Sequence, residues 1–169
     1  MKQRRFSIEE LNTMNARNFA GALAGVFEKS AWVPELAWRS RPFKTVDDLH
    51  EALCRVVREA EESKKLHLIR AHPELANPAQ QLTAESRSEQ SSAALDRLPH
   101  SEKGFFADLN RRYRERFGFP FVICVKQHGS GAILENFQKR LNNTPVAEMN
   151  SAIDEICKIA YFRLLDLTG

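Results

Sequence analysis

The chain has 169 residues, of which 43% are apolar and 28% are charged, and both shares are typical of a globular domain. No apolar run approaches the roughly 20 residues of a membrane-spanning helix, so no membrane partner is expected. The 25 basic and 22 acidic residues give a net charge of +3. That balance argues against a dedicated nucleic-acid binder and is compatible with a small anionic ligand.

Size and cysteine content predict one intracellular domain. At this length a single domain over residues 1–169 buries about 70% of its unfolded surface without metals or disulfides. The cysteines, Cys54, Cys124 and Cys157, are odd in number and form no C-x-x-C pair, so neither a disulfide framework nor a zinc site is indicated. The basic start is interrupted by Ser7 and acidic residues, which argues against a secretory signal. We therefore expect a cytoplasmic protein with no metal.

Helical signals dominate the chain up to its first irregular segment. Ser7 and Glu10 form a capping box that opens a short helix, and apolar side chains at helical spacing follow it. Ser30 is expected to cap a third short helix, and Thr45 a longer one. Pro73 limits the next helix, because the residue before a proline avoids the α region.

A loop and another helix are predicted after this proline. Residues 74–82 contain the turn signal Asn-Pro and are expected to form a loop. Ser86 and Glu89 form a second S-x-x-E box, which predicts a helix that starts there and runs toward Leu98.

The next helix is predicted over residues 101–117. Phe105, Leu109 and Tyr113 lie at helical spacing and are expected on its buried side. Gly118 is expected to end it, because glycine readily adopts the left-handed conformation that closes many helices.

The last predicted elements complete an all-α fold. Residues 119–125 are rich in aromatic and β-branched side chains, but no second strand signal lies nearby, so an extended segment is expected rather than a sheet. Helices are predicted over residues 130–141 and 145–165, the last with proline at its first position. The predicted fold is a single-domain helical bundle of about eight to nine helices with one short extended segment near 119–125.

Three short segments break the helical pattern where helices start or stop. They are AHPELA at 71–76, SRSEQ at 86–90 and FGFPFVICV at 117–125. Helix ends carry unpaired backbone N–H and C=O groups, so polar side chains gathered there can hold a small polar ligand. A functional site is therefore predicted in this region.

His72 is the candidate for proton transfer, because it precedes a proline at a helix end and histidine titrates near neutral pH. The structural alternative is a histidine bonded to a neighbouring carbonyl, and position alone does not decide between the two. His67 lies five residues earlier, on another helix face, so the two do not form a metal-binding pair. His50, His100 and His128 have no partners at ligand spacing and are expected on the surface.

The second and third segments offer complementary polar groups. Glu89 fits a purely structural capping role. However, Ser86, Arg87, Glu89 and Gln90 also place a hydroxyl, a cation, a carboxylate and an amide at one helix start, which suits a ligand dense in carbonyl and amide groups. An extended segment over residues 121–124 would offer unpaired backbone groups, and core packing of its side chains is compatible with that role.

Two further groups have mainly structural interpretations. The basic run Arg111, Arg112, Arg114 and Arg116 could bind nucleic acid, and a non-catalytic interaction module is the alternative hypothesis for this chain. The run is divided between two helix sides, which favours a solvated helix exterior. Cys124 lies in an apolar run, so a buried inert thiol is expected.

Taken in order, these motifs cover nearly the whole chain and resemble one family, the 2-oxo-4-hydroxy-4-carboxy-5-ureidoimidazoline (OHCU) decarboxylases, which form (S)-allantoin at the end of urate oxidation. One departure is visible where members often have Ala-Gly-Leu and this chain has Ala93-Ala94-Leu95. The matching residues are Phe27-Glu28-x-Ser30-x-Trp32-Val33, Ala37-Trp38, Arg41-Pro42-Phe43, Ala71-His72-Pro73-Glu74-Leu75-Ala76, Leu82-Thr83-Ala84-Glu85-Ser86-x-x-Glu89-Gln90, Leu95, Leu109-Asn110-x-x-Tyr113, Phe117-Gly118-Phe119-Pro120-Phe121-Val122-Ile123-Cys124 and Arg163-Leu164-x-Asp166-Leu167.

The resemblance implies an all-helical enzyme, usually a homodimer, that uses no cofactor. It implies that His72 is the catalytic histidine, and we expect Glu89 to assist it. It also implies that the substrate pocket is lined by Pro73, by Ser86, Arg87, Ser88, Glu89 and Gln90, and by the backbone of Phe121, Val122, Ile123, Cys124 and Val125.

Overall fold

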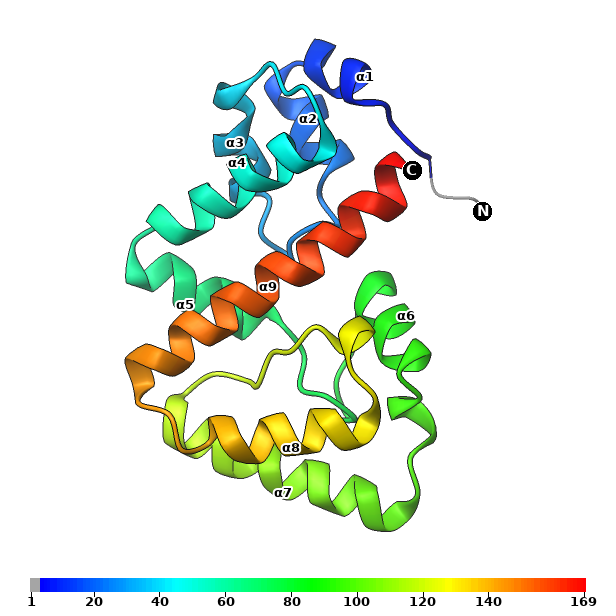
Figure 1. The fold of residues 1–169 in the computed structure, drawn as a ribbon, viewed down its shortest axis with the longest axis vertical. Coiled ribbons are helices and arrows are strands. Elements are labelled where there is room, and N and C mark those ends of the chain that lie inside the picture. Colours follow the sequence, from blue (N-terminus) through cyan, green and yellow to red (C-terminus); the bar gives the residue numbers. More distant parts are fainter. Residues whose placement is uncertain (1–3) are drawn as a thin grey trace. The chain divides into compact units, whose positions relative to one another are not determined.

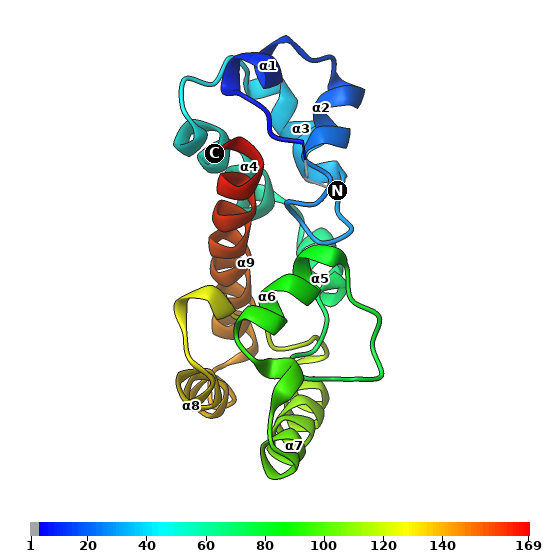
Figure 2. The same cartoon turned by 90° about the vertical axis from the view of Figure 1, so that its right-hand side faces the viewer.

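The computed structural model describes residues 4–169 and is all-helical over that range (Figures 1 and 2). Nine α-helices and three short 3-10 helices (η) are found there and no strand, which confirms the predicted class. None of the described helices is long and apolar enough to cross a membrane. In chain order the elements are α1 (Ile8–Thr13), α2 (Ala16–Ala22), α3 (Trp32–Ala37), η1 (Trp38–Ser40), α4 (Val46–Glu59), α5 (Glu62–Ala71), α6 (Ala84–Ser92), η2 (Leu95–Arg97), α7 (His100–Phe117), η3 (Val125–Gln127), α8 (Ser130–Arg140) and α9 (Pro145–Thr168).

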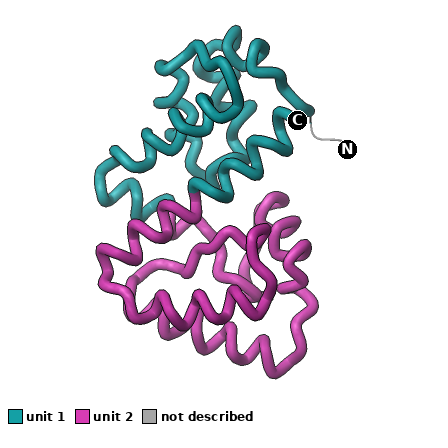
Figure 3. The backbone as a smooth tube through the Cα atoms, viewed as in Figure 1, with its two compact units in different colours: residues 1–68, 157–169 teal, residues 69–156 magenta. Residues whose placement is uncertain are grey.

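The described chain forms two compact units (Figure 3). Unit 1 comprises residues 1–68 and 157–169, and unit 2 comprises residues 69–156. The helices α5 and α9 each contribute residues to both units. Unit 1 is therefore assembled from two separate stretches of sequence, whereas unit 2 is continuous.

The helix starts in unit 1 follow local capping chemistry at two of the three predicted positions. Ser7 caps α1, and Thr45 caps α4 in a second capping box. The prediction for Ser30 was wrong, because α3 follows Ala31 without a side-chain cap. The Ser30 hydroxyl instead donates to the Glu28 carbonyl oxygen at 2.8 Å.

Long-range polar contacts join the C-terminal stretch to the rest of unit 1. Arg163 donates to Glu28 at 3.0 Å in a buried ion pair. The Phe6 N–H donates to the Leu167 carbonyl oxygen at 2.8 Å. The prediction that His50 lies on the surface was wrong: it is half-buried, and its Nε2 lies 2.7 Å from a carbonyl oxygen of this stretch.

In unit 2, α7 buries a slightly different side from the one predicted. Gly118 ends the helix in the left-handed conformation, with φ of 73°, as expected. Leu109 and Tyr113 are buried, but Phe105 is 62% exposed and Phe106 is buried instead. Phe106 is buried in place of Phe105 because positions 106, 109 and 113 lie on one side of the helix, and position 105 lies at the edge of that side.

The predicted run of α6 toward Leu98 was wrong. The helix ends at Ser92, and Ala94 takes the left-handed conformation with φ of 57° before the short η2 begins. A left-handed residue breaks the α-helical hydrogen-bond ladder, so the chain turns here. Ala94 stands where members of the family that the sequence resembles often have glycine. Its left-handed conformation is one that glycine favours.

A buried carboxylate connects three helices of unit 2 with the extended segment. Glu148 on α9 is fully buried and accepts hydrogen bonds from the Tyr113 hydroxyl, from Arg140 Nε at 2.7 Å and from Asn143 Nδ2 at 2.9 Å. Arg140 also donates from Nη1 to the Val122 carbonyl oxygen at 2.7 Å. Such a charge is tolerated inside a protein because it is paired with a cation and accepts several hydrogen bonds.

Replacing Ala94 by glycine is expected to stabilise the protein. The left-handed conformation costs a residue with a Cβ about 1–2 kcal/mol, while glycine loses roughly 0.5–1 kcal/mol more backbone entropy on folding, so we expect a gain of about 0.5–1 kcal/mol in the free energy of unfolding. Urea denaturation measures it. Ala93→Gly is the control, because Ala93 has φ of −87° and gains no relief. An A94G protein no more stable than wild type would contradict the expectation.

The buried Tyr113 hydroxyl is expected to make stability depend on alkaline pH. Burial, followed by the hydrogen bond to Glu148, raises the pKa of Tyr113 above its ordinary value. The unfolded tyrosine ionises near pH 10, so its stabilising contribution is complete below that pH and falls as pH rises further. Tyr113→Phe should cost about 1–3 kcal/mol at pH 8.

The difference between wild type and Y113F should then shrink by about 1 kcal/mol between pH 8 and pH 11. Denaturant unfolding of both proteins at the two pH values measures this change. Tyr161 is present in both, so its titration cancels from the comparison. A difference that stays constant with pH would show that Tyr113 does not titrate on unfolding as expected.

Candidate functional site

His72 lies at the start of the loop between α5 and α6. The helix α5 ends at Ala71, as Pro73 requires, and the His72 N–H donates to the Ile69 carbonyl oxygen at 3.1 Å. His72 is buried, with 6% of its surface exposed, and Pro73 is half-buried. The backbone restriction and the burial together confine the imidazole to a defined place in unit 2.

The loop after His72 is fixed by side chains from both neighbouring helices. From α6, Gln90 accepts the Ala76 N–H at 3.0 Å with Oε1 and donates to the Glu74 carbonyl oxygen at 3.4 Å with Nε2. From α7, Asn110 donates to the Leu75 carbonyl oxygen at 2.9 Å. The Gln90 amide thus binds the loop backbone, a contact that its place in the sequence does not indicate.

The α6 helix begins three residues earlier than predicted. Its cap is Thr83, whose side chain accepts the Ser86 N–H, so the prediction of a Ser86–Glu89 capping box was wrong. Glu89 stands one turn further along and has no part in the cap. Ser86, Glu89 and Gln90 share one helix side at spacings of three and four residues.

Burial divides the SRSEQ segment into two groups. Ser86 and Gln90 are buried and Glu89 is half-buried, whereas Arg87 and Ser88 are exposed. The hydroxyl, carboxylate and amide therefore face the interior, and the cation does not.

The extended segment keeps part of its backbone unpaired. The Val122 carbonyl oxygen accepts from Arg140, and the Cys124 N–H donates to Glu155 at 2.8 Å. Between these two fixed points, Ile123 is 4% exposed, and neither its N–H nor its C=O has a hydrogen-bond partner within residues 4–169. The same holds for Phe121, which is fully buried. Buried peptide groups are rarely left unpaired, so this backbone is suited to receive a polar ligand.

Unit 2 brings the three predicted segments together. Gln90 joins α6 to the loop that follows His72, and α6 packs against η3, which directly continues the extended segment. Figure 3 shows residues 69–156, which include α6 and this loop, as one unit in magenta. His72, the polar side of α6 and the unpaired backbone of Ile123 thus belong to neighbouring parts of one unit, although they are distant in sequence.

The arginine run on α7 is paired rather than free. Arg111 donates to Asp108 at 2.7 Å and to Glu115 at 3.1 Å, which raises the pKa of Arg111. Arg114 forms an ion pair with Glu74, and Arg116 donates to a backbone carbonyl oxygen. Local acids thus neutralise much of this run, as expected of a solvated helix exterior.

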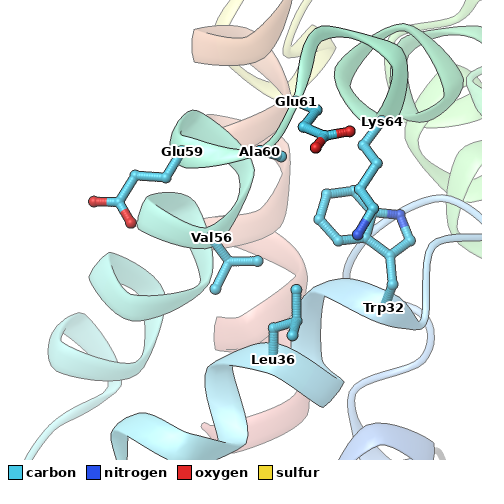
Figure 4. A pocket seen from close by; sticks show the side chains of 7 residues that line it. All are labelled: Trp32, Leu36, Val56, Glu59, Ala60, Glu61 and Lys64. Atoms are coloured by element: carbon cyan, nitrogen blue, oxygen red, sulfur yellow. The ribbon is translucent and has the colours of Figure 1, made fainter.

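The remaining candidates show no catalytic arrangement among the described residues. Cys54, Cys124 and Cys157 are buried and form no disulfide, and no group of three metal-ligating side chains is found in residues 4–169. A pocket of about 460 Å³ in unit 1 is lined by none of the predicted site residues (Figure 4). There the Lys64 ammonium lies 5.3 Å from the Trp32 ring centroid, and none of the lining residues is buried.

Sequence comparison identifies the relatives of this chain. The model of the OHCU decarboxylase family matches residues 12–165. The 2-oxo-4-hydroxy-4-carboxy-5-ureidoimidazoline decarboxylase of Halalkalicoccus jeotgali is 38% identical over 164 residues, covering 97% of this chain and 93% of that protein. The protein of the same name from Haloferax volcanii is 40% identical over 160 residues and 95% of both chains.

Solved structures share the fold. A crystal structure of (S)-allantoin synthase superimposes with a TM-score of 0.78 and 27% identity over 96% of this chain, which spans about half (54%) of that chain. A structure of OHCU decarboxylase in the presence of (S)-allantoin matches 82% of this chain and 91% of that chain with a TM-score of 0.67 and 22% identity, and supports the fold alone. By the family model and the near full-length relatives, this chain belongs to the OHCU decarboxylase family.

Proposed function

We propose that this protein decarboxylates OHCU to (S)-allantoin, the last step of urate oxidation, with residues 1–169 acting as one catalytic domain. The observation that carries the proposal is the family match over residues 12–165, with relatives of that name aligned over nearly their full length. We further propose that the enzyme is a cytoplasmic homodimer that binds neither nucleic acid nor membrane.

The reaction places modest demands on the protein. When the bond between the ring carbon and the carboxylate breaks, CO2 leaves and the electron pair moves into the adjacent C=N bond of the ring. The substrate thus supplies its own electron sink, and the proposed mechanism requires neither a cofactor nor a metal. The protein must orient the ring, accept the hydroxyl proton and deliver a proton to one face of the enol-like intermediate.

His72 is proposed as the general acid or base, with Glu89 assisting it. A buried imidazole at a backbone-restricted position suits directed proton transfer, which typically contributes about 10²- to 10⁴-fold in rate. Ser86 and Glu89 would bind the polar groups of the substrate from the buried side of α6. Arg87 and Ser88, which are exposed, would contribute at the edge of the site.

The extended segment is proposed to recognise the ureido or ring amide through its backbone. An amide edge presents a donor beside an acceptor, and the N–H and C=O of Ile123 provide the complementary pair. Phe121, Val122, Cys124 and Val125 would complete this wall. Gln90 would act mainly on the loop after His72, because its Oε1 and one N–H are bound there.

Replacing His72 by alanine should abolish enzyme-dependent turnover. OHCU is prepared fresh from urate with the two preceding enzymes, and formation of (S)-allantoin is followed by circular dichroism. We expect kcat/KM to fall by about 10²- to 10⁴-fold with unchanged helical content. His67→Ala, an exposed position on α5, is the matched control and should retain activity. Undiminished stereoselective turnover by H72A would refute the assignment.

Glu89→Gln tests the assisting carboxylate in the same assay. The substitution keeps the size of the side chain and removes its charge, so a drop in kcat with little change in stability is expected. Glu85→Gln, one turn earlier on α6, is the control for loss of charge from this helix. Equal activity of the two variants would argue against a role for Glu89 in proton handling.

A further inference from the structure

The loop that follows His72 contains a buried carboxylate. Glu74 lies two residues after His72, and only 6% of its surface is exposed. One of its carboxylate oxygens accepts from Asn77 Nδ2 at 2.9 Å, and the other accepts from Arg114 on α7. Among the described residues, Arg114 is the only cation that forms an ion pair with Glu74. This pair therefore ties the loop beside His72 to α7, 40 positions further along the chain.

The backbone of the loop is fixed at the same place. The Glu74 N–H donates to Gln80 Oε1 at 2.7 Å, and the Glu74 carbonyl oxygen accepts from Gln90 Nε2 at 3.4 Å. Asn110 on α7 donates to the Leu75 carbonyl oxygen, while its own Oδ1 is buried and has no hydrogen-bond partner among the described residues. The Asn110 side chain thus bonds only to this loop. All polar groups of Glu74, in backbone and side chain, are likewise bonded.

The conformation of Ala76 indicates that outside contacts impose the shape of this loop. Its φ of 54° lies in the left-handed region, which is unfavourable for a residue with a Cβ. Such a conformation persists only where the surrounding structure fixes it. Between His72 and Glu74 stands Pro73, whose ring restricts φ to about −65°. The two residues are thus joined through a single rigid residue, so a shift of Glu74 would also displace His72.

We propose that Glu74, held by Arg114, is a positioning residue for the imidazole of His72. This role rests on the proposed decarboxylase function, in which His72 transfers a proton. That transfer requires the imidazole within hydrogen-bond reach of the reacting group, and a misplacement of about 1 Å can lower a rate by about 10²-fold. The substrate-binding groups proposed on α6 and on the extended segment lie outside this loop. Loss of the ion pair should therefore lower kcat and leave KM nearly unchanged.

Arg114→Met removes the cation and keeps an unbranched side chain that suits a helix. In the (S)-allantoin assay we expect it to lower kcat about tenfold, with KM within about threefold of wild type. Arg114→Lys keeps the positive charge and should recover most of this loss. The matched control is Arg112→Met, because Arg112 is also exposed on α7 and its acidic partner, Asp108, lies on the same helix. That variant should retain wild-type kcat and KM.

A double variant separates loss of the ion pair from burial of an unpaired charge. When Glu74→Gln is combined with Arg114→Met, no carboxylate is left buried without its cation, so the protein should fold at least as well as R114M. The ion pair is missing from both proteins, so both should show the same lowered kcat, and the two substitutions should not add. A double variant with wild-type kcat would overturn the positioning role.

The ring signals of His72 in nuclear magnetic resonance spectra report on its surroundings independently of turnover. In the isotope-labelled full chain, with these signals assigned by their absence from H72A, they should shift in R114M and stay unchanged in R112M. A lowered kcat with unchanged His72 signals would overturn the positioning role, because the loss would then arise elsewhere.

Two different results separate this positioning role from the proposed function. Wild-type protein that does not accelerate (S)-allantoin formation would refute the decarboxylase function, and the positioning role with it. Turnover that depends on His72 but is equal in R114M and R112M would overturn the positioning role alone. Lower stability of R114M with unchanged kcat would have the same meaning, because it would assign the ion pair to the fold only.

Discussion

The Glu148 carboxylate is the interaction on which unit 2 depends. It is fully buried, and its partners come from α7 (Tyr113), from α8 (Arg140) and from the turn before α9 (Asn143). Leaving such a charge unpaired costs about 3–5 kcal/mol, a large share of the stability of a typical domain. The same arginine holds the Val122 carbonyl oxygen. The extended backbone that we propose as a binding surface is thus anchored by the packing of the unit, as preorganised binding requires.

Helix-capping patterns made much of the fold predictable from the sequence. The wrong predictions of helix starts also have local causes. Ser7 and Thr45 cap helices as their patterns indicate. Near α6, however, two overlapping patterns compete, since both Thr83 and Ser86 precede a polar residue by three positions. Only one of them can take the extended conformation of a cap, and starting at Thr83 adds a turn of helix and buries Ser86. The pattern alone could not choose between these registers.

The contacts that fix the candidate site were not predictable in the same way. Asn110 and Leu75 are 35 positions apart, and Glu74 and Arg114 are 40 apart, so no local periodicity relates them. The positions of His72 and of the polar residues in SRSEQ could be singled out because helix ends leave signals in sequence. The binding of the Gln90 amide to the loop, the unpaired peptide of Ile123 and the unpaired Asn110 oxygen depend on tertiary packing and appear only in the structure.

The discontinuity of unit 1 has a consequence for synthesis on the ribosome. Unit 2 is continuous, so all its contacts can form once residue 156 has emerged. Unit 1 contains residues that precede unit 2, yet it needs Arg163 beside Glu28 and the Leu167 carbonyl oxygen beside Phe6, and both are made after unit 2. Domains generally fold in the order in which they are made. Until residues 163–167 have been made, the N-terminal stretch of unit 1 cannot complete its fold, and that interval is when its apolar side chains depend most on protection from aggregation.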